Sequence, residues 1–491
     1  MLKHSAAAPM ATSVRQPRLN LDEIQGDVLW GLQKNAEAFV FFKIQNISLF
    51  KQWLRQFLQH ITNTRQVQYR DLILRRYRQM GRKTRQSLYG LNLGFTWHGL
   101  NALVGIRRPG LDPSFEEGAD SPGTIARLND PPKSRWLPKF TSDRIDGVFL
   151  ITGPDPPSVT FHFNKLLNFF GTSVKLVYSE MGTTRPGAER GHEHFGFLDG
   201  ISQPGIRGLT SQSNAIREPD EGLPGQDLLW PGEFVFGYPA QDPQDPTKEG
   251  PPPETAAPWM HNGSYMVFRR LEQKVPEFRR FVVEQAARLG MDSELLAARM
   301  IGRWKSGAAV ELAPLRDDPR LAGDKKRNND FGFGDDPFQR RCPYAAHIRK
   351  VYTRDDLDEA EAQRHRILRA GIPFGPEVAP GETTTKRGRG LMFVCYQTSI
   401  ERQFEYIQRQ ANDPAFVGGK RRPGSGAVTP GFDPIIGQAE GAGVRTMDEP
   451  YPNYPAGSRR TTLTIPKHFV ELTAAAYFFM PSITALRTVL T

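Results

Sequence analysis

The stretch Glu37-Ala38-Phe39-Val40-Phe41-Phe42-Lys43-Ile44 begins the pattern that sets the architecture of this chain. It is short, apolar and rich in aromatic side chains, which predicts a buried β-strand. The next apolar residues recur at spacings of three and four, as is typical of an amphipathic helix: Leu49, Trp53, Leu54, Phe57 and Leu58. The pattern therefore opens with a strand and a helix that can cover one face of a sheet.

The same alternation continues to about residue 178. Residues 88–95 and 147–152 are predicted as strands, residues 159–170 as a helix and residues 173–178 as a last strand. The order β-α-β-β-α-β is that of a ferredoxin-like domain. The second half repeats it more loosely, with strands predicted at residues 233–238, 263–269 and 390–396 and helices at residues 275–288, 293–302 and 400–410.

We therefore expect an α+β fold of two ferredoxin-like domains, with antiparallel sheets and peripheral helices. A chain of 491 residues also exceeds what one hydrophobic core usually supports. The predicted parts are a disordered tail over residues 1–20, an N-terminal domain over residues 21–222 and a C-terminal domain over residues 223–491, with a linker near residues 211–231 and long loops at residues 239–258 and 418–431.

The apolar runs are too short for a membrane protein. None reaches the roughly eighteen residues that a bilayer span needs. The beginning of the chain, with one lysine and no sustained apolar core, does not have the pattern of a secretory signal. We therefore expect a cytoplasmic protein that does not associate with membranes.

The net charge of +11 is concentrated in one segment. Between Arg65 and Arg85 eight basic residues face a single acid, Asp71. Tyr69 and Tyr77 are the aromatic residues there, and no nucleic-acid-binding fold accompanies them. The segment favours a solvated basic face that attracts anionic substrates, with salt-sensitive binding of nucleic acid as the alternative.

A carboxylate stands out in the run GHEHFGFLDGISQP, residues 191–204. Asp199 lies beside Gly200 and three residues after Gly196, among large apolar side chains. Glycines allow tight turns and close approach to a bound group. An acid in such surroundings needs a hydrogen bond, an ion pair or a chemical task, although a turn-capping Asp is the ordinary interpretation of the run alone.

Three residues of the second half bear on that interpretation. His347 ends a small apolar run, where a histidine is more often structural than a ligand. Arg369 lies amid apolar residues, and a buried guanidinium needs an anionic partner. Asp433 lies in an apolar loop and precedes a proline, which is also an ordinary turn signal.

Taken in order, these segments resemble the dye-decolourising (DyP-type) haem peroxidases. GFLDG, residues 196–200, matches the GxxDG motif of that family. AHIRK, residues 346–350, is similar to the segment of its proximal haem ligand, and LRAGIPFG, residues 368–375, to that of its distal arginine. EIQGDV, residues 23–28, resembles the start of the longer, fungal-type branch.

The resemblance implies one b-type haem per chain, bound in the C-terminal half. Cys342 and Cys395 form no CxxCH motif, so the haem would be held without covalent bonds. His347 would ligate the iron, and Asp433 would accept a hydrogen bond from its far nitrogen. Asp199 would shuttle the proton of hydrogen peroxide, while Arg369 would stabilise the charge that develops as the O–O bond breaks.

Three further residues are expected at the haem. Leu391 and Phe393, on one face of their strand, resemble an apolar pair of the distal pocket, and core packing explains them equally well. Arg349 would reach a haem propionate, and a solvated charge is the equal alternative.

The implied reaction is oxidation of phenolic and dye-like aromatic donors by hydrogen peroxide. Its carboxylate base predicts a low pH optimum. Phe374 and Gln410 stand where the family often has an oxidisable tyrosine and tryptophan, so small phenols are expected to be better donors than bulky dyes. One alternative is a haem-handling, deferrochelatase-like reaction. The other is a non-catalytic haem-binding protein, and the Asp199–Arg369 pair argues against this second alternative only. A monomer and a homodimer are both compatible with the sequence.

Overall fold

The computed structural model describes residues 16–81, 89–105, 111–210, 222–255, 257–417, 430–437, 440, 444–449, 461–466 and 468–491. Its strands are β1 Ala36–Ile44, β2 Gly90–Phe95, β3 Gly147–Gly153, β4 Val174–Thr183, β5 Gly205–Ile206, β6 Leu228–Leu229, β7 Ser264–Gln273, β8 Leu368–Arg369, β9 Ile372–Phe374, β10 Gly390–Gln397, β11 Arg445–Glu449, β12 Thr461–Ile465 and β13 Val470–Met480.

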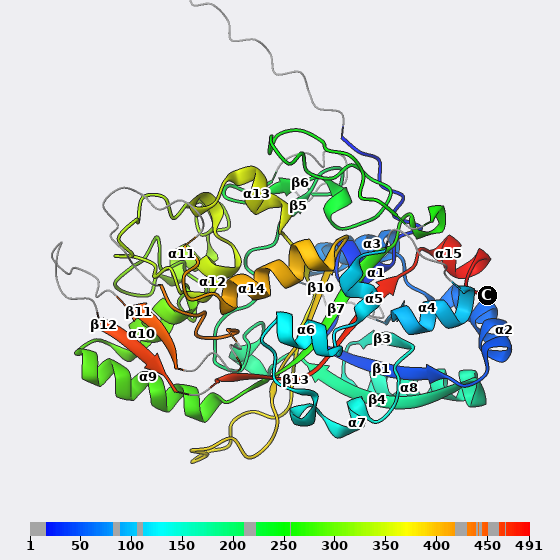
Figure 1. Ribbon diagram of the computed structural model, residues 1–491, viewed down its shortest axis with the longest axis horizontal. Helices are drawn as coiled ribbons and strands as arrows, with labels where there is room; N and C mark the ends of the chain where they lie inside the picture. Colours follow the sequence, from blue (N-terminus) through cyan, green and yellow to red (C-terminus); the bar gives the residue numbers. More distant parts are fainter. Residues whose placement is uncertain are drawn as a thin grey trace, which may run out of the picture.

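The longer helices lie around the strands (Figure 1). In the first half they are α2 Ile47–Phe57, α3 Thr64–Gln79, α4 Trp97–Val104 and α8 Pro156–Phe170. In the second half they are α9 Val275–Leu289, α10 Ser293–Ile301 and α14 Tyr406–Asn412. The short helices are α1 Gly26–Leu29, α5 Pro113–Glu117, α6 Pro122–Arg127, α7 Pro138–Thr141, α11 Pro319–Gly323, α12 His347–Val351, α13 Glu359–Arg364 and α15 Ile483–Thr488. No helix in the described ranges is long and apolar enough to cross a membrane.

One antiparallel sheet runs through both halves of the described chain. Its nine strands follow the order β7-β13-β2-β3-β1-β4-β9-β10-β8, and β7 also pairs with β10. That additional pairing closes the sheet into a ring. The halves meet where Phe479 of β13 lies opposite Phe95 of β2, and where Gly182 of β4 lies opposite Phe374 of β9.

The predicted α+β fold with antiparallel sheets is thereby confirmed. The pairing of strands between the two halves was not predicted from the sequence pattern. The predicted domain boundaries stay a prediction. Residues 1–15 of the expected tail, most of the expected linker and most of the loop at residues 418–431 lie outside the described ranges. So do Arg82, Lys83 and Arg85 of the basic segment, whose first part forms the helix α3.

β1 is buried on both faces, which explains its continuous apolar composition. Successive side chains of a strand point to opposite faces. Phe41 packs across the inside of the ring against Phe268 of β7, with ring centroids 4.9 Å apart. Its neighbour Phe42 packs outwards against Phe50 of α2 at 5.7 Å. The strand therefore joins the inner core to the helix layer.

The prediction of a strand at residues 233–238 is wrong. A short 3-10 turn, Pro231–Glu233, is followed there by further turns. The Gly232 N–H bonds to the Pro239 carbonyl at 2.7 Å, so the segment closes on itself instead of pairing with a strand. Gly237, with φ of 90°, provides a conformation that other residues rarely adopt.

The helix predicted at residues 400–410 begins as a π-helix, Ile400–Glu405, and continues as α14. Phe404 of the π-helix lines the cavity described below, together with Ile407 and Gln408 of α14. π-turns of this kind are frequent beside functional sites.

Candidate functional site

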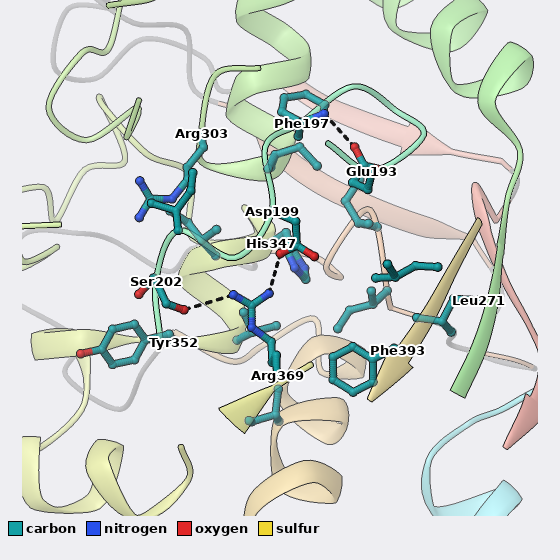
Figure 2. A pocket seen from close by; sticks show the side chains of 18 of the residues that line it. Glu193, Phe197, Asp199, Ser202, Leu271, Arg303, His347, Tyr352, Arg369 and Phe393 are labelled. Carbon is teal, nitrogen blue, oxygen red and sulfur yellow. Dashed lines mark hydrogen bonds and ion pairs between the residues drawn. The ribbon is translucent and has the colours of Figure 1, made fainter. Parts of the chain in front are cut away.

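A cavity collects the residues that the sequence singled out. Its lining includes Asp199, His347, Arg369, Leu391 and Phe393. Figure 2 shows Arg369 reaching towards Asp199, with Phe393 on one side and Tyr352 on the other. Residues 193–202 supply one wall, and the remaining lining residues belong to the second half of the chain.

Asp199 and Arg369 form an ion pair in this cavity. The Nη1 atom of Arg369 lies 2.9 Å from Oδ1 of Asp199, and its Nη2 donates to the Ser202 carbonyl at 3.1 Å. The two side chains are 39% and 33% exposed because they face the open cavity. Burial in the protein opposes ionisation of Asp199, but the charge of Arg369 and the hydrogen bond from the Gly200 N–H outweigh it and hold the pKa of Asp199 below its usual value.

The loop that carries Asp199 depends on its glycines and on one acid. Gly196 and Gly200 have φ of 102° and 74°, a region that favours glycine. Glu193 accepts hydrogen bonds from the backbone N–H groups of Phe195 and Phe197, at 2.9 and 2.8 Å. Sequence reasoning missed this role of Glu193, although the residue lies inside the motif that it identified.

His347 is the first residue of α12 and faces the same cavity. Its Nδ1 lies 2.8 Å from Oδ2 of Asp433, which is fully buried. The other carboxylate oxygen of Asp433 accepts from the N–H groups of Ile435 and Ile436, at 2.7 and 3.0 Å. The carboxylate is thus fixed, and it orients the imidazole so that Nε2 is left as the atom available to a metal.

One end of the cavity is positively charged. Arg303 bonds to the Gly307 carbonyl at 3.0 Å and to the side chain of Asn329, and Arg354 bonds to the Phe331 carbonyl at 2.8 Å. Neither has a salt bridge to a carboxylate within the described residues. Burial, followed by the charge of Arg354, lowers the pKa of Arg303 to about 9. Two such guanidinium groups suit the anionic groups of a ligand.

Arg349 does not lie in this cavity. It is 2% exposed, its Nε donates to Oδ2 of Asp356 at 2.6 Å, and its Nη1 donates to the Cys342 carbonyl at 2.6 Å. Its guanidinium also stacks on the ring of Tyr344 at 4.0 Å. The structure therefore gives Arg349 structural partners and does not support the propionate role expected from the sequence. Arg303 and Arg354, which the sequence did not single out, face the cavity instead.

Leu391 and Phe393 both line the cavity, as the two-residue period of β10 requires. Phe374 and Gln410 are buried, at 1% and 7% exposure, so neither provides a surface group that can be oxidised. Cys342 and Cys395 are buried free thiols.

Comparisons with known proteins agree over the length of the chain. Residues 23–186 match the family described as the DyP dimeric alpha+beta barrel domain, and residues 239–417 match the C-terminal family of Dyp-type peroxidases. Peroxidase 2 of Mycetinis scorodonius is 37% identical over 500 residues, which covers 99% of this chain and 90% of that protein.

Solved structures give the same result. A single-residue mutant of the dye-decolorizing peroxidase from Pleurotus ostreatus superposes with a TM-score of 0.83 at 37% identity, covering 97% of this chain and 100% of that one. A dye-decolorizing peroxidase in complex with 2,6-dimethoxyphenol superposes with a TM-score of 0.80 at 36% identity, covering 96% and 99% of the two chains.

Proposed function

This chain belongs to the dye-decolourising peroxidase family and is a haem-dependent peroxidase, and from that premise we propose which of its residues carry the reaction. His347 holds the iron of a b-type haem. Asp199 moves the proton of hydrogen peroxide, and Arg369 assists cleavage of the O–O bond. The observation that carries the proposal is that the Asp199–Arg369 pair lines one cavity together with His347, whose Nδ1 bonds to the buried Asp433 behind it.

The residues present fit a haem. A neutral imidazole with a carboxylate on its far nitrogen is a suitable iron ligand. Leu391 and Phe393 offer apolar contact, and Arg303 and Arg354 are the candidates for the two propionates. Neither cysteine lines the cavity, which supports non-covalent binding. When bound, the haem supplies the redox chemistry of the reaction.

The protein's own contribution is proton transfer and charge stabilisation. An ordinary aspartate is ionised at neutral pH, and Arg369 lowers the pKa of Asp199 further. Asp199 can therefore accept a proton from the inner oxygen of peroxide and return it to the outer oxygen as water leaves. The permanent charge of Arg369 stabilises the anionic peroxide and the negative charge that builds up on the departing oxygen. The 2.9 Å separation of the two groups supports their acting together at one point of the cavity.

Small phenols are the donors that we propose. Support comes from the relative whose structure contains 2,6-dimethoxyphenol and from the buried Phe374 and Gln410, which provide no route through an oxidisable surface side chain at these positions. A deferrochelatase-like or purely haem-binding role is not favoured, since the full-length relatives are peroxidases.

The test is the absorption spectrum of the haem-reconstituted protein before and after addition of peroxide. We expect a ferric Soret band that changes within milliseconds, and its loss in His347→Ala because the iron ligand is gone. Asp199→Asn and the double variant Asp199→Asn/Arg369→Leu should bind haem normally and react with peroxide at least 100-fold more slowly. Haem retention in His347→Ala, or a fast reaction in the double variant, would refute the assigned roles.

A further inference from the structure

Arg369 lies on an exposed edge of the sheet. β8, which contains it, is the last strand in the sheet order and pairs with β10 on one side. The neighbouring residue Ala370 donates its N–H to Val394 of β10 at 3.0 Å. Because successive residues of an antiparallel strand direct their backbone polar groups to opposite sides, the N–H and C=O groups of Arg369 point away from β10.

Gln203 occupies that free side. Its Oε1 accepts the Arg369 N–H at 3.2 Å, and its Nε2 donates to the Arg369 carbonyl at 2.6 Å. One side-chain amide thus satisfies both backbone groups of one residue, as a neighbouring strand would. The carbonyl of Gln203 is in turn held by Nε2 of Gln226 at 3.0 Å.

The segment that contains Gln203 also carries Asp199. Asp199 and the Ser202 carbonyl bond to the guanidinium of Arg369. The side chain of Gln203 bonds to the backbone of Arg369. An ion pair alone leaves a long side chain free to choose among rotamers. The backbone bonds from Gln203 limit how far β8 can move relative to the segment that carries Asp199.

We propose that Gln203 is a positioning residue of the peroxidase reaction: it fixes the position of Arg369 relative to Asp199. This inference rests on the role proposed above for Arg369. Charge stabilisation depends on donors placed before the reaction, and a displacement of about 1 Å can cost up to 100-fold in rate. Gln203 itself needs no contact with peroxide or with the haem to act in this way.

The chain contains a matched control. Gln25 makes the same two bonds to the backbone of Leu93, accepting its N–H at 2.8 Å and donating to its carbonyl at 2.8 Å. Gln25 is fully buried, and neither it nor Leu93 lines the cavity. Nε2 of Gln25 also donates to the Pro481 carbonyl, at 2.9 Å. The variant Gln25→Leu therefore removes a similar glutamine clamp, with one further bond, at a place that does not hold Arg369.

The experiment compares Gln203→Leu, Gln25→Leu, Arg369→Leu and the double variant Gln203→Leu/Arg369→Leu, each loaded with haem. We expect the second-order rate with hydrogen peroxide to fall about tenfold in Gln203→Leu and to stay within twofold of the wild type in Gln25→Leu. The double variant should react as slowly as Arg369→Leu alone, because Gln203 acts through Arg369. The KM for a phenolic donor should not change in Gln203→Leu.

A second measurement does not depend on catalysis. In the haem-free protein, hydrogen–deuterium exchange of the Arg369 amide should be at least tenfold faster in Gln203→Leu, and unchanged in Gln25→Leu. Should Gln203→Leu fold poorly, Gln203→Glu keeps the acceptor for the N–H and loses the donor to the carbonyl. Its peroxide rate should then lie between those of the wild type and Arg369→Leu.

Each outcome bears on a separate claim. A wild-type rate in Gln203→Leu, or a further tenfold loss in the double variant relative to Arg369→Leu, would overturn the positioning role while leaving the proposed function intact. A wild-type rate in Arg369→Leu would overturn the role of Arg369 and this inference with it. Equal losses in Gln203→Leu and Gln25→Leu would show a general effect of lost stability instead of positioning.

Discussion

At the level of single residues, the site depends on two carboxylates with different surroundings. Asp433 is fully buried and has all its partners within the protein, so it can orient His347 but cannot exchange protons readily with solvent. Asp199 faces the cavity beside Arg369. Two residues of the same type therefore support different tasks, one as a fixed acceptor and one as a proton carrier.

The pKa of Asp199 predicts the acid limit of the peroxide reaction. Because Arg369 and the Gly200 N–H hold this pKa below the usual value of an aspartate, the base form persists as the pH falls from 7 towards the range, near about 4, in which an ordinary aspartate titrates. We expect the second-order rate with peroxide, measured by stopped flow, to be flat over this range and to fall about tenfold per pH unit well below it. Asp199→Asn should be slow at every pH. A wild-type midpoint near pH 6 would contradict this assignment.

Substitutions at Arg303 and Arg349 should have opposite effects: the first should weaken haem binding and the second should lower stability. Arg303 faces the cavity without a carboxylate partner among the described residues, so Arg303→Gln should weaken haem binding about tenfold to 100-fold and change stability little. Arg349→Gln should leave haem affinity unchanged and lower the unfolding free energy of the haem-free protein by about 3 kcal/mol, since Asp356 loses its partner. Haem titration and urea unfolding measure the two effects, and the reverse pattern would restore Arg349 as the propionate partner.

At the level of elements, the loop bearing Asp199 is tied to β9 by a buried histidine. His194 is 1% exposed, its Nε2 lies 2.8 Å from the Phe374 carbonyl, and its Nδ1 has no hydrogen-bond partner in the described structure. Burial lowers the pKa of His194 to about 4. The ring is therefore neutral in the folded protein at pH values where an unfolded histidine, with a pKa of about 6.5, takes up a proton.

This difference predicts a loss of stability in weak acid. Below pH 6.5 the unfolded state binds a proton that the folded state does not, so the unfolding free energy falls as the pH falls towards 4. The contribution of His194 between pH 7 and pH 5 is about 2 kcal/mol. Urea unfolding of the haem-free wild type and of His194→Gln, which keeps a donor for Phe374 and cannot titrate, isolates this contribution. Parallel pH profiles for the two proteins would contradict it.

The elements could be predicted where apolar periodicity reflects their cause. The strand at residues 37–44 and the helix after it were found because their apolar periods are continuous. The strand predicted at residues 233–238 failed because Gly232 and Pro239 close the segment through their backbones, which apolar composition does not reveal. The surroundings of Arg349 were not predicted either, because its partner Asp356 lies in the separate 3-10 turn Arg354–Asp356, which has no apolar period.

At the level of the whole molecule, the residues proposed to carry the reaction come from both halves, and the sheet explains how they meet. The motif containing Asp199 follows β4, while Arg369 lies on β8 and His347 begins α12. The order and identity of these residues could be predicted from the resemblance. Their meeting in one cavity depends on pairings between distant strands, such as β4 with β9, and those have no signal in local periodicity.

The shared sheet predicts that the haem-free protein unfolds as one unit. Each half contributes one block of adjacent strands to a single ring, β2-β3-β1-β4 from the first half and β9-β10-β7-β13 from the second. Phe41 of β1 packs inside this ring against Phe268 of β7 and Phe478 of β13, so the inner core belongs to neither half alone. We expect one calorimetric transition with equal calorimetric and van't Hoff enthalpies, in spite of the two domains expected from length. Two separate transitions would show that the halves are independent folding units.

The seam between β4 and β9 offers a direct way to test that coupling. A Cβ atom added at Gly182 would lie 2.4 Å from Cγ2 of Ile372, 2.6 Å from Cε of Met392 and 3.0 Å from the Pro373 carbonyl oxygen, so Gly182→Val displaces the two side chains and strains the contact between β4 and β9. The matched control is Gly323→Val, because a Cβ at Gly323 meets nothing within 4 Å. If the seam couples the halves, Gly182→Val lowers the Tm by several degrees and splits the single calorimetric peak, whereas Gly323→Val leaves one peak. A lower Tm with an unsplit peak would instead mean that the opposite seam, between β2 and β13, is enough to keep the two halves cooperative.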